Sequence, residues 1–322
     1  MIKILPLIKK ANNILIVCHQ RPDGDTLGSG LAFYFLCTAM GKRADIVSDS
    51  PIPAHYHFMA GIGALNNQSC KSYDLTIVVD CADAPRMGKF ADYVNSTVSI
   101  NIDHHKTNDR FAKHNIVVAD ASSTCEVVYD ILASEGIFAP DSFIEANTLK
   151  NIAQSLAVGL STDTGHFMHS SVNAKVLQTA ANLASFGADV HEITNHIYRS
   201  KTKERMFLLS KALQGLRFFY DDRICIMTLL LSDFEKFNAL PMQTEGFIDY
   251  PLSIQHTQVA VTISQHEKDI FKVSFRSKGL DVSEVAGVFG GGGHARASGC
   301  QITGPYEEVV ERIVKAIKDR MD

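Results

Sequence analysis

The stretch HQRPDGDTLGS at residues 19–29 follows the apolar run NILIVC at 13–18 and precedes a long, mostly apolar segment. The first run is typical of a buried strand, and residues 26–40 are typical of a helix that Gly41 ends. The loop between them carries one histidine and two aspartates. This order of strand, polar loop and helix predicts the first unit of a sheet covered by helices.

Acidic or histidine clusters close two further apolar runs. VVDCAD at 78–83 ends the run LTIVVD at 75–80, and IDHHKTN at 102–108 ends the run VSINID at 98–103. A similar apolar run, ADIVS, lies at 44–48. In open parallel sheets ligands bind beyond the carboxyl ends of the strands, so we expect these polar clusters to meet at one edge.

The residue types in these clusters indicate metal-assisted phosphoester chemistry. Carboxylates and imidazoles suit Mn²⁺ or Mg²⁺, and two such ions about 4 Å apart can activate water and stabilise a transferring phosphoryl group. The sequence Pro-Asp-Gly-Asp alone is also typical of a turn, and an isolated His-His pair is typical of a surface. Three clusters, each at the end of a separate strand, favour a two-metal site over these alternatives.

The rest of the chain continues in helices and then strands. Segments with helical patterning are 123–136, 147–160, 171–189 and 191–213, and Asp163 falls in a predicted loop after the second. Strand patterning at 223–231, 258–265 and 270–277 is followed by helical patterning at 281–289 and 304–320. The polar helical stretch between the two parts is the predicted connector.

Length and composition limit the class of protein. A chain of 322 residues with 46% hydrophobic and 20% charged residues is typical of two globular domains. No run approaches the roughly 18 apolar residues of a membrane span, and Lys and Pro interrupt the N-terminal segment. We therefore expect a cytoplasmic protein without a membrane partner. Seven cysteines without CxxC spacing argue against a disulfide framework or structural zinc.

The charge balance limits the substrate. The formal net charge is −4, and neither half of the chain has an excess of Lys and Arg. This excludes a surface that holds long nucleic acid through many phosphate contacts. Two divalent ions would offset the net charge and place the positive potential at the reaction centre, which favours a small phosphorylated substrate.

The motif HxxPDxDxxGS, followed by a strand-ending aspartate and Asp-His-His, resembles the DHH phosphoesterase superfamily. GLSTDTGHF at 159–167 resembles its fourth metal motif. FGGGGHARASG at 289–299 resembles the glycine-rich motif of the DHH-associated C-terminal domain. With the chain length, the pattern resembles the NrnA-type oligoribonucleases (nano-RNases) that also dephosphorylate 3′-phosphoadenosine 5′-phosphate (pAp).

The resemblance implies an α/β fold. It implies an N-terminal parallel-sheet DHH domain at 1–187, a helical linker at 188–203, and a smaller C-terminal α/β domain at 204–322 with the GGGH motif. The implied activity is hydrolysis of short oligoribonucleotides to nucleoside monophosphates, and of pAp to AMP plus phosphate. The implied cofactors are two divalent ions, Mn²⁺ with Mg²⁺ as the alternative. A homodimer is possible.

The resemblance also assigns the metal ligands. It gives His19 and Asp23 to the first ion, Asp25, His104 and Asp163 to the second, and Asp80 to both. His105 resembles the catalytic histidine, which would contact the scissile phosphate or protonate the leaving oxygen. The alternative is that His105 only orients a ligand. Asp103 is expected to accept the N–H of a ligating imidazole.

A second group is expected to bind substrate. By resemblance, the residues that grip a substrate phosphate or nucleotide are Arg276, Ser277, Gly291, Gly292, Gly293 and His294. Glycines let backbone N–H groups approach an anion, and arginine has a planar fork suited to phosphate. Four glycines alone could also form a flexible loop, and Arg296 is an alternative cation.

Three other functions compete with this hypothesis. A linear or cyclic dinucleotide phosphodiesterase would need the same metals and a different hold on the far nucleotide. A family II pyrophosphatase is disfavoured because the expected SRKK cluster is absent. A nucleotide-sensing regulator built on an inactive phosphoesterase would be expected to lose ligands, and none is missing here.

Overall fold

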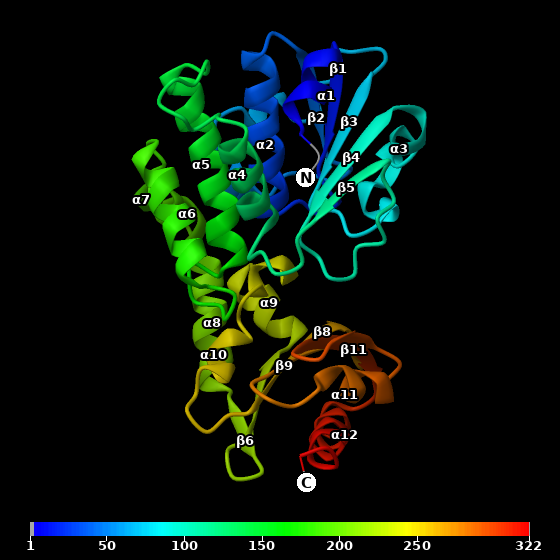
Figure 1. The fold of residues 1–322 in the computed structure, drawn as a ribbon. Coiled ribbons are helices and arrows are strands. Elements are labelled where there is room, and N and C mark those ends of the chain that lie inside the picture. The colour runs from blue at the N-terminus through cyan, green and yellow to red at the C-terminus, as the bar shows by residue number, and fades with distance from the viewer. Residues whose placement is uncertain (1–2, 322) are drawn as a thin grey trace. The chain divides into compact units, whose positions relative to one another are not determined.

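The structure is a computed structural model that describes residues 3–321. The chain divides into two compact units, Met1–Ser200 and Lys201–Asp322, coloured blue to green and green to red in Figure 1. Among the described residues, no helix is both long enough and apolar enough to cross a membrane.

The first unit contains a five-stranded, fully parallel sheet in the order β2-β1-β3-β4-β5. Its strands are β1 (Asn13–Val17), β2 (Arg43–Val47), β3 (Leu75–Val79), β4 (Val98–Asp103) and β5 (His114–Val117). This confirms the predicted parallel sheet. β5 was not predicted, because HNIV is too short and too polar to stand out as an apolar run.

Helices cover both faces of this sheet (Figure 1). The main layer contains α1 (Leu5–Lys10), α2 (Gly24–Ala39), α4 (Thr124–Ser134), α5 (Ala146–Asp163) and α6 (Ala174–Ser185). The other face carries η3 (Ala84–Phe90) and α3 (Tyr93–Ser96), and the turns η1 (Ala54–Tyr56) and η2 (Ile62–Ala64) lie between β2 and β3. Side chains alternate along the strands, so Ile16 packs under the main layer and Val17 under η3 and α3.

Small residues bring α2 and α5 into backbone contact. A Cβ atom on Gly28 would lie 2.3 Å from the carbonyl oxygen of Ser155, and one on Gly159 would lie 2.7 Å from Asp25 Oδ1. Asp25 is in the first turn of α2, and Asp163 is the last residue of α5. The close contact therefore brings two predicted metal ligands to the same end of the helical layer.

The connector is helical, as predicted, but it is interrupted. It contains α7 (Val190–Ile193), the π-helix η4 (Thr194–Tyr198) and, after residues 199–202, α8 (Lys203–Gln214). Ile193 and Ile197 are buried in the core of the first unit. The Thr202 hydroxyl accepts the N–H of Arg205 and starts α8 as a new helix. The domain bounds 1–187, 188–203 and 204–322 stay predictions.

The second unit has a six-stranded mixed sheet in the order β10-β11-β9-β8-β7-β6. Its strands are β6 (Arg217–Phe219), β7 (Ile224–Leu229), β8 (Val259–Glu267), β9 (Ile270–Ser277), β10 (Gly292–His294) and β11 (Ala297–Thr303). Its further helices are α9 (Leu231–Phe237), η5 (Pro241–Thr244), α10 (Asp249–Leu252), α11 (Val282–Val288) and α12 (Tyr306–Lys318). The glycine-rich segment forms the β10–β11 hairpin, so the flexible-loop alternative is wrong.

We expect Gly28→Ala to destabilise the first unit by about 1–3 kcal/mol, because the added methyl group must push α5 away from α2. Calorimetric unfolding will measure the loss. Gly287→Ala in α11 is the matched control, because a Cβ there meets nothing within 4 Å. That change should stabilise its helix by roughly 0.5–1 kcal/mol. Equal effects at the two glycines would contradict the close helix contact.

Candidate metal centre

The predicted metal ligands come together at the carboxyl end of the parallel sheet. There are three groups of side chains, and within each group the atoms that could bind a metal lie within 4.8 Å of one another. They are His19, Asp23 and Asp80; Asp25, His104 and Asp163; and Asp80, His104 and His105. Because Asp80 and His104 each belong to two groups, the three groups form one continuous cluster.

Asp80 lies at the centre of this cluster. It follows β3 with a left-handed backbone (φ +59°), a conformation that aspartate tolerates better than most residues. Its Oδ2 is 3.3 Å from His19 Nε2, and its Oδ1 is 3.8 Å from His104 Nε2. The two carboxylate oxygens thus face different imidazoles, which is the arrangement expected of a ligand shared by two ions.

The start of α4 holds the buried Asp25. Its Oδ2 accepts the backbone N–H of Thr124 at 2.6 Å, and its Oδ1 accepts that of Cys125 at 2.8 Å. The Thr124 hydroxyl also donates to Asp80 Oδ1 at 3.0 Å. Free N–H groups at a helix start favour negative charge. Sequence reasoning missed Thr124, because its Ser-Thr pattern marks a helix start without showing what that helix faces.

His19 is oriented by the backbone. Its Nδ1 lies 2.7 Å from the carbonyl oxygen of Gln20, which can only accept, so Nδ1 carries the proton. Nε2 then lies 3.6 Å from Asp23 Oδ1 and 3.3 Å from Asp80 Oδ2. Nε2 is buried and has no hydrogen-bond partner within residues 3–321. A buried, unpartnered imidazole nitrogen between two carboxylates fits a site for a cation.

His104 and Asp163 complete the opposite side of the cluster. His104 Nδ1 is 3.3 Å from the carbonyl oxygen of Ala121, and Nε2 is 3.1 Å from Asp163 Oδ2. The prediction that Asp163 lies in a loop is wrong, because α5 continues to this residue. The Thr164 hydroxyl donates to the carbonyl oxygen of Leu160. The turn-like sequence at 161–165 therefore forms the last turn of α5 and does not end the helix before Asp163.

The charges of the cluster are unbalanced without a cation. Burial, and then repulsion by Asp163 and Asp80, raises the pKa of Asp25. Burial opposes a charge on His19 and on His104, but the neighbouring carboxylates raise both pKa values to about 10. Asp25, His19 and His104 therefore retain protons more readily than isolated side chains do, and a divalent ion would displace protons from these same groups.

Asp103 forms a pair with His105 at the edge of the cluster. Asp103 Oδ1 lies 2.7 Å from His105 Nδ1 and accepts the backbone N–H of His104 at 2.8 Å. The hydrogen bond to Asp103 raises the pKa of His105. Asp103 thus contacts a ring not assigned to a metal, whereas the rings of His19 and His104 both face backbone carbonyls.

The second unit brings Arg276 and His294 into one row of its sheet. Arg276 on β9 pairs with Ala297 on β11, and Ala297 pairs with His294 on β10. Directly paired residues point to the same face of a sheet. The neighbouring Phe275 is buried in the core beneath α11 and α12, so the row lies on the opposite face.

The structure does not bring Ser277 into this row. Ser277 is buried on the core side, and its hydroxyl donates to the carbonyl oxygen of Leu280. Gly291 and Gly293 allow close backbone packing, because a Cβ atom there would lie 2.2 Å from the Gly299 oxygen and 2.6 Å from the Ala297 oxygen. The exposed Gly292 has no such contact, and Arg296 donates to the same Leu280 oxygen as Ser277.

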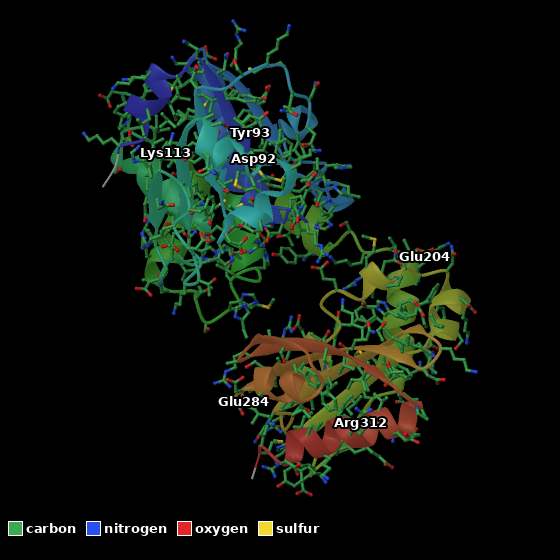
Figure 2. The ribbon with its side chains drawn as sticks, turned by 90° about the vertical axis from the view of Figure 1, so that its right-hand side faces the viewer. Asp92, Tyr93, Lys113, Glu204, Glu284 and Arg312 are labelled. Atoms are coloured by element: carbon green, nitrogen blue, oxygen red, sulfur yellow. The ribbon has the colours of Figure 1, made fainter. Side chains whose placement is uncertain are left out.

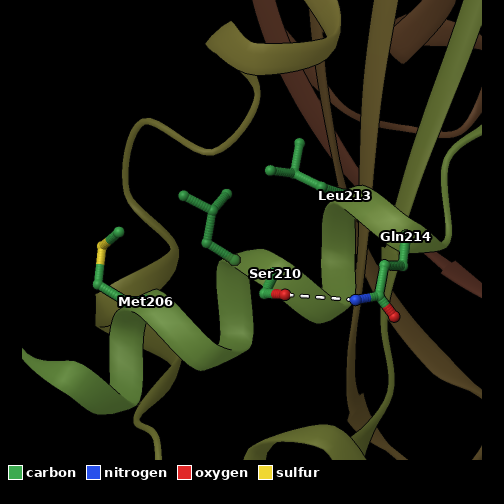
Figure 3. A pocket seen from close by; sticks show the side chains of 5 residues that line it. Met206, Ser210, Leu213 and Gln214 are labelled. Atoms are coloured by element: carbon green, nitrogen blue, oxygen red, sulfur yellow. Dashed lines mark hydrogen bonds between the residues drawn. The ribbon is translucent and has the colours of Figure 1, made fainter.

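A shallow depression also lies on α8 (Figure 3). The side chains lining it are Met206, Leu209, Ser210, Leu213 and Gln214. Gln214 donates to the Ser210 hydroxyl at 3.4 Å, and none of the lining side chains titrates. This depression therefore offers a weakly polar surface and no hydrolytic group.

Proteins of known name and structure resemble the chain over nearly its full length. A bifunctional oligoribonuclease and PAP phosphatase NrnA from Thermus thermophilus is 27% identical, over 96% of this chain and 90% of the relative. A probable enzyme of the same name from Streptococcus mutans is also 27% identical, over 92% and 91%. The crystal structure of an exopolyphosphatase-related protein from Bacteroides fragilis superposes with a TM-score of 0.87 at 26% identity, covering 98% of this chain and 94% of that one.

Two known domain families match the chain, one in each unit. The N-terminal domain of the DHH family matches residues 13–160, and the DHHA1 domain matches residues 222–322. The first match contains every predicted ligand except Asp163, and the second contains the row of Arg276, Ala297 and His294. On the two domains and the relatives together, the chain belongs to the DHH family of phosphoesterases.

Proposed function

We propose that this protein is a metal-dependent phosphoesterase that converts short oligoribonucleotides to nucleoside monophosphates and pAp to AMP plus phosphate. The observation that carries the proposal is the continuous cluster of aspartates and histidines joined through Asp80 and His104. His19, Asp25 and Asp80 in this cluster are buried. The names of the NrnA relatives support the choice of substrates. The cytoplasmic location and the possible homodimer stay predictions.

The cluster provides ligands for two ions. We propose that the first ion is held by His19, Asp23 and Asp80, and the second by Asp25, Asp80, His104 and Asp163. Oxygen and imidazole ligands favour Mn²⁺, with Mg²⁺ as the alternative. Such ions, when bound, lower the pKa of a water molecule and stabilise charge on phosphoryl oxygens. The backbone contacts to Asp25, His19 and His104 fix the directions of the ligand atoms beforehand.

His105 has the position of a proton donor or phosphate contact. Its Nδ1 faces Asp103, so Nε2 stays free, and about a third of its side chain is exposed. The same ring lies 3.6 Å from Asp80 Oδ1, which places it at the edge of the cluster. We propose that Nε2 contacts a phosphoryl oxygen of the substrate or protonates the leaving oxygen.

The second unit would hold a phosphate that does not react. The planar fork of Arg276 can bind phosphate through two parallel hydrogen bonds, and His294 can donate a further one. Two strand spacings, roughly 10 Å, separate their backbones. The small Ala297 between them leaves room for the anion. Because a remote phosphate occurs in pAp and in 5′-phosphorylated RNA ends, one recognition row can serve both substrates.

The proposal predicts a ranking of substrates. With Mn²⁺ present, pAp and short RNA should both be hydrolysed much faster than pyrophosphate or a cyclic dinucleotide, because both present a phosphoester and a free phosphate. Side-by-side turnover assays of the purified protein will measure this. Faster turnover of the cyclic dinucleotide would favour the dinucleotide phosphodiesterase instead.

Asp80→Asn tests the metal centre. The amide keeps the shape and can still accept from Thr124 but lacks the charge shared by both ions. We expect Mn²⁺ to raise the melting temperature of the wild type and not that of the variant, because only the wild type gains binding energy on folding. Turnover should be lost. Two tightly bound ions in the variant, measured by elemental analysis, would contradict the shared role.

Arg276→Ala tests the second unit. We expect kcat/KM to fall at least about tenfold on pAp and short RNA, because remote binding energy contributes to both kcat and KM. Turnover of bis-p-nitrophenyl phosphate, which has no second phosphate, should barely change. The matched control is Arg312→Ala on α12, which packs on the core side of the sheet (Figure 2). Equal losses on all three substrates would show that Arg276 supports the fold.

A further inference from the structure

Asn108, in the loop after Asp-His-His, closes a polar network that the metal ligands do not use. Its Nδ2 lies 2.6 Å from Asp103 Oδ2, 2.8 Å from Asn101 Oδ1 and 3.0 Å from the carbonyl oxygen of Cys81. Its Oδ1 accepts the N–H of Arg110 at 2.7 Å. One side chain therefore ties the end of β4, the residue after Asp80 and the following loop together.

The contacts leave only one orientation for the Asn108 amide. The carboxylate of Asp103 and the carbonyl of Cys81 can only accept, and the N–H of Arg110 can only donate. The neighbouring Asn101 is fixed in the same way, because its Nδ2 lies 3.2 Å from the carbonyl oxygen of Cys81. Rotating either amide group by 180° would place its oxygen against the carbonyl oxygen of Cys81, and neither atom can donate a hydrogen bond. The network is therefore specified by its chemistry and not only by its shape.

Asp103 depends on this donor. Its carboxylate is fully buried, with His105 Nδ1 and the His104 N–H on Oδ1 and, among the residues that the structure describes, only Asn108 on Oδ2. A buried carboxylate oxygen without a donor is costly. Without Asn108, the Asp103 carboxylate would lower its free energy by rotating towards another donor. Its Oδ1 would then no longer accept the hydrogen bond that orients His105.

We propose that Asn108 is a positioning residue: it fixes the Asp103 carboxylate and thereby holds His105 with Nδ1 protonated and Nε2 directed to the substrate. This inference rests on the proposed phosphoesterase function, in which Nε2 of His105 acts on the reacting phosphate. It extends that function by naming the group that prepares His105, in the same way that outer hydrogen-bond partners orient ligand imidazoles. Asn108 itself touches neither substrate nor metal in this role.

The first experiment compares two asparagines that both hold the loop between β4 and β5, Asn108 within the loop and Asn115 on β5. Asn108→Ala should lower kcat by about 10–100-fold, with KM within about twofold and the bound metal unchanged. Asn115→Ala is the matched control. Asn115 also holds this loop, through Arg110 and Ala112, but does not contact Asp103. Its kcat should equal that of the wild type. An equal loss in both variants would assign the effect to loop stability and overturn the proposal.

The second experiment reads His105 directly and needs no substrate. In Mg²⁺-loaded protein labelled with ¹⁵N-histidine, the wild-type spectrum should show a proton on His105 Nδ1, identified by its absence in His105→Ala. Asn108→Ala should lose this single protonation pattern, and Asn115→Ala should keep it. A wild-type His105 with Nδ1 unprotonated would overturn the proposal even if the alanine variant does not fold. Since turnover plays no part, failure here is distinct from failure of the proposed function.

The third experiment is a double-mutant cycle between Asn108 and His105. In single-turnover assays with excess enzyme, Asn108→Ala should cost at least about tenfold in the wild-type background and nothing further in the His105→Ala background. Non-additivity is expected because the two residues act as one unit. Full additivity would show that Asn108 acts elsewhere and would contradict the positioning role.

Discussion

The placement of several negative charges in a buried cluster is the constraint on which the first unit depends. Asp25 and Asp80 are almost fully buried, and carboxylates cannot be taken from water without partners. The chain meets this cost locally with donors it already has: the free N–H groups at the start of α4 for Asp25, and those at the start of α2 for Asp23. The histidines supply the rest of the compensating charge, and a divalent ion can replace their protons.

The same cluster explains the close contact between α2 and α5. Gly28 and Gly159 let the two helices touch at the backbone. The carboxylates at the start of one helix and the end of the other then share a single site with His104. Larger residues at the contact would separate Asp25 from Asp163, although neither side chain would itself change. The geometry of the site therefore depends on the packing of these two helices.

Much of the fold and of the cluster could be predicted from the sequence, because both follow from short-range patterns. Buried parallel strands read as apolar runs, and the rule for their carboxyl ends located His19, Asp80 and His104 without a structure. Thr124 and Asn108 could not be found in this way. Their roles depend on partners distant in sequence, such as Asp25 for the N–H of Thr124. The β10–β11 hairpin was missed because β10 consists of two glycines and a histidine, which carry little strand signal.

The two units differ in how firmly their candidate site residues are held. In the first, hydrogen bonds to backbone groups or to Thr124 hold the side chains of Asp25, Asp80, His19 and His104. The chemistry of a transferring phosphoryl group requires such fixed positions. In the second, the Arg276–Ala297–His294 row sits on a polar sheet face where the side chains are partly or fully exposed. Exposed side chains can adjust to nucleotides of different length, whereas the buried Asp25 and Asp80 cannot. Under the proposed function, a rigid reaction centre combined with an adaptable phosphate-binding row would explain how one hydrolytic geometry accepts both a small bisphosphate and short RNA.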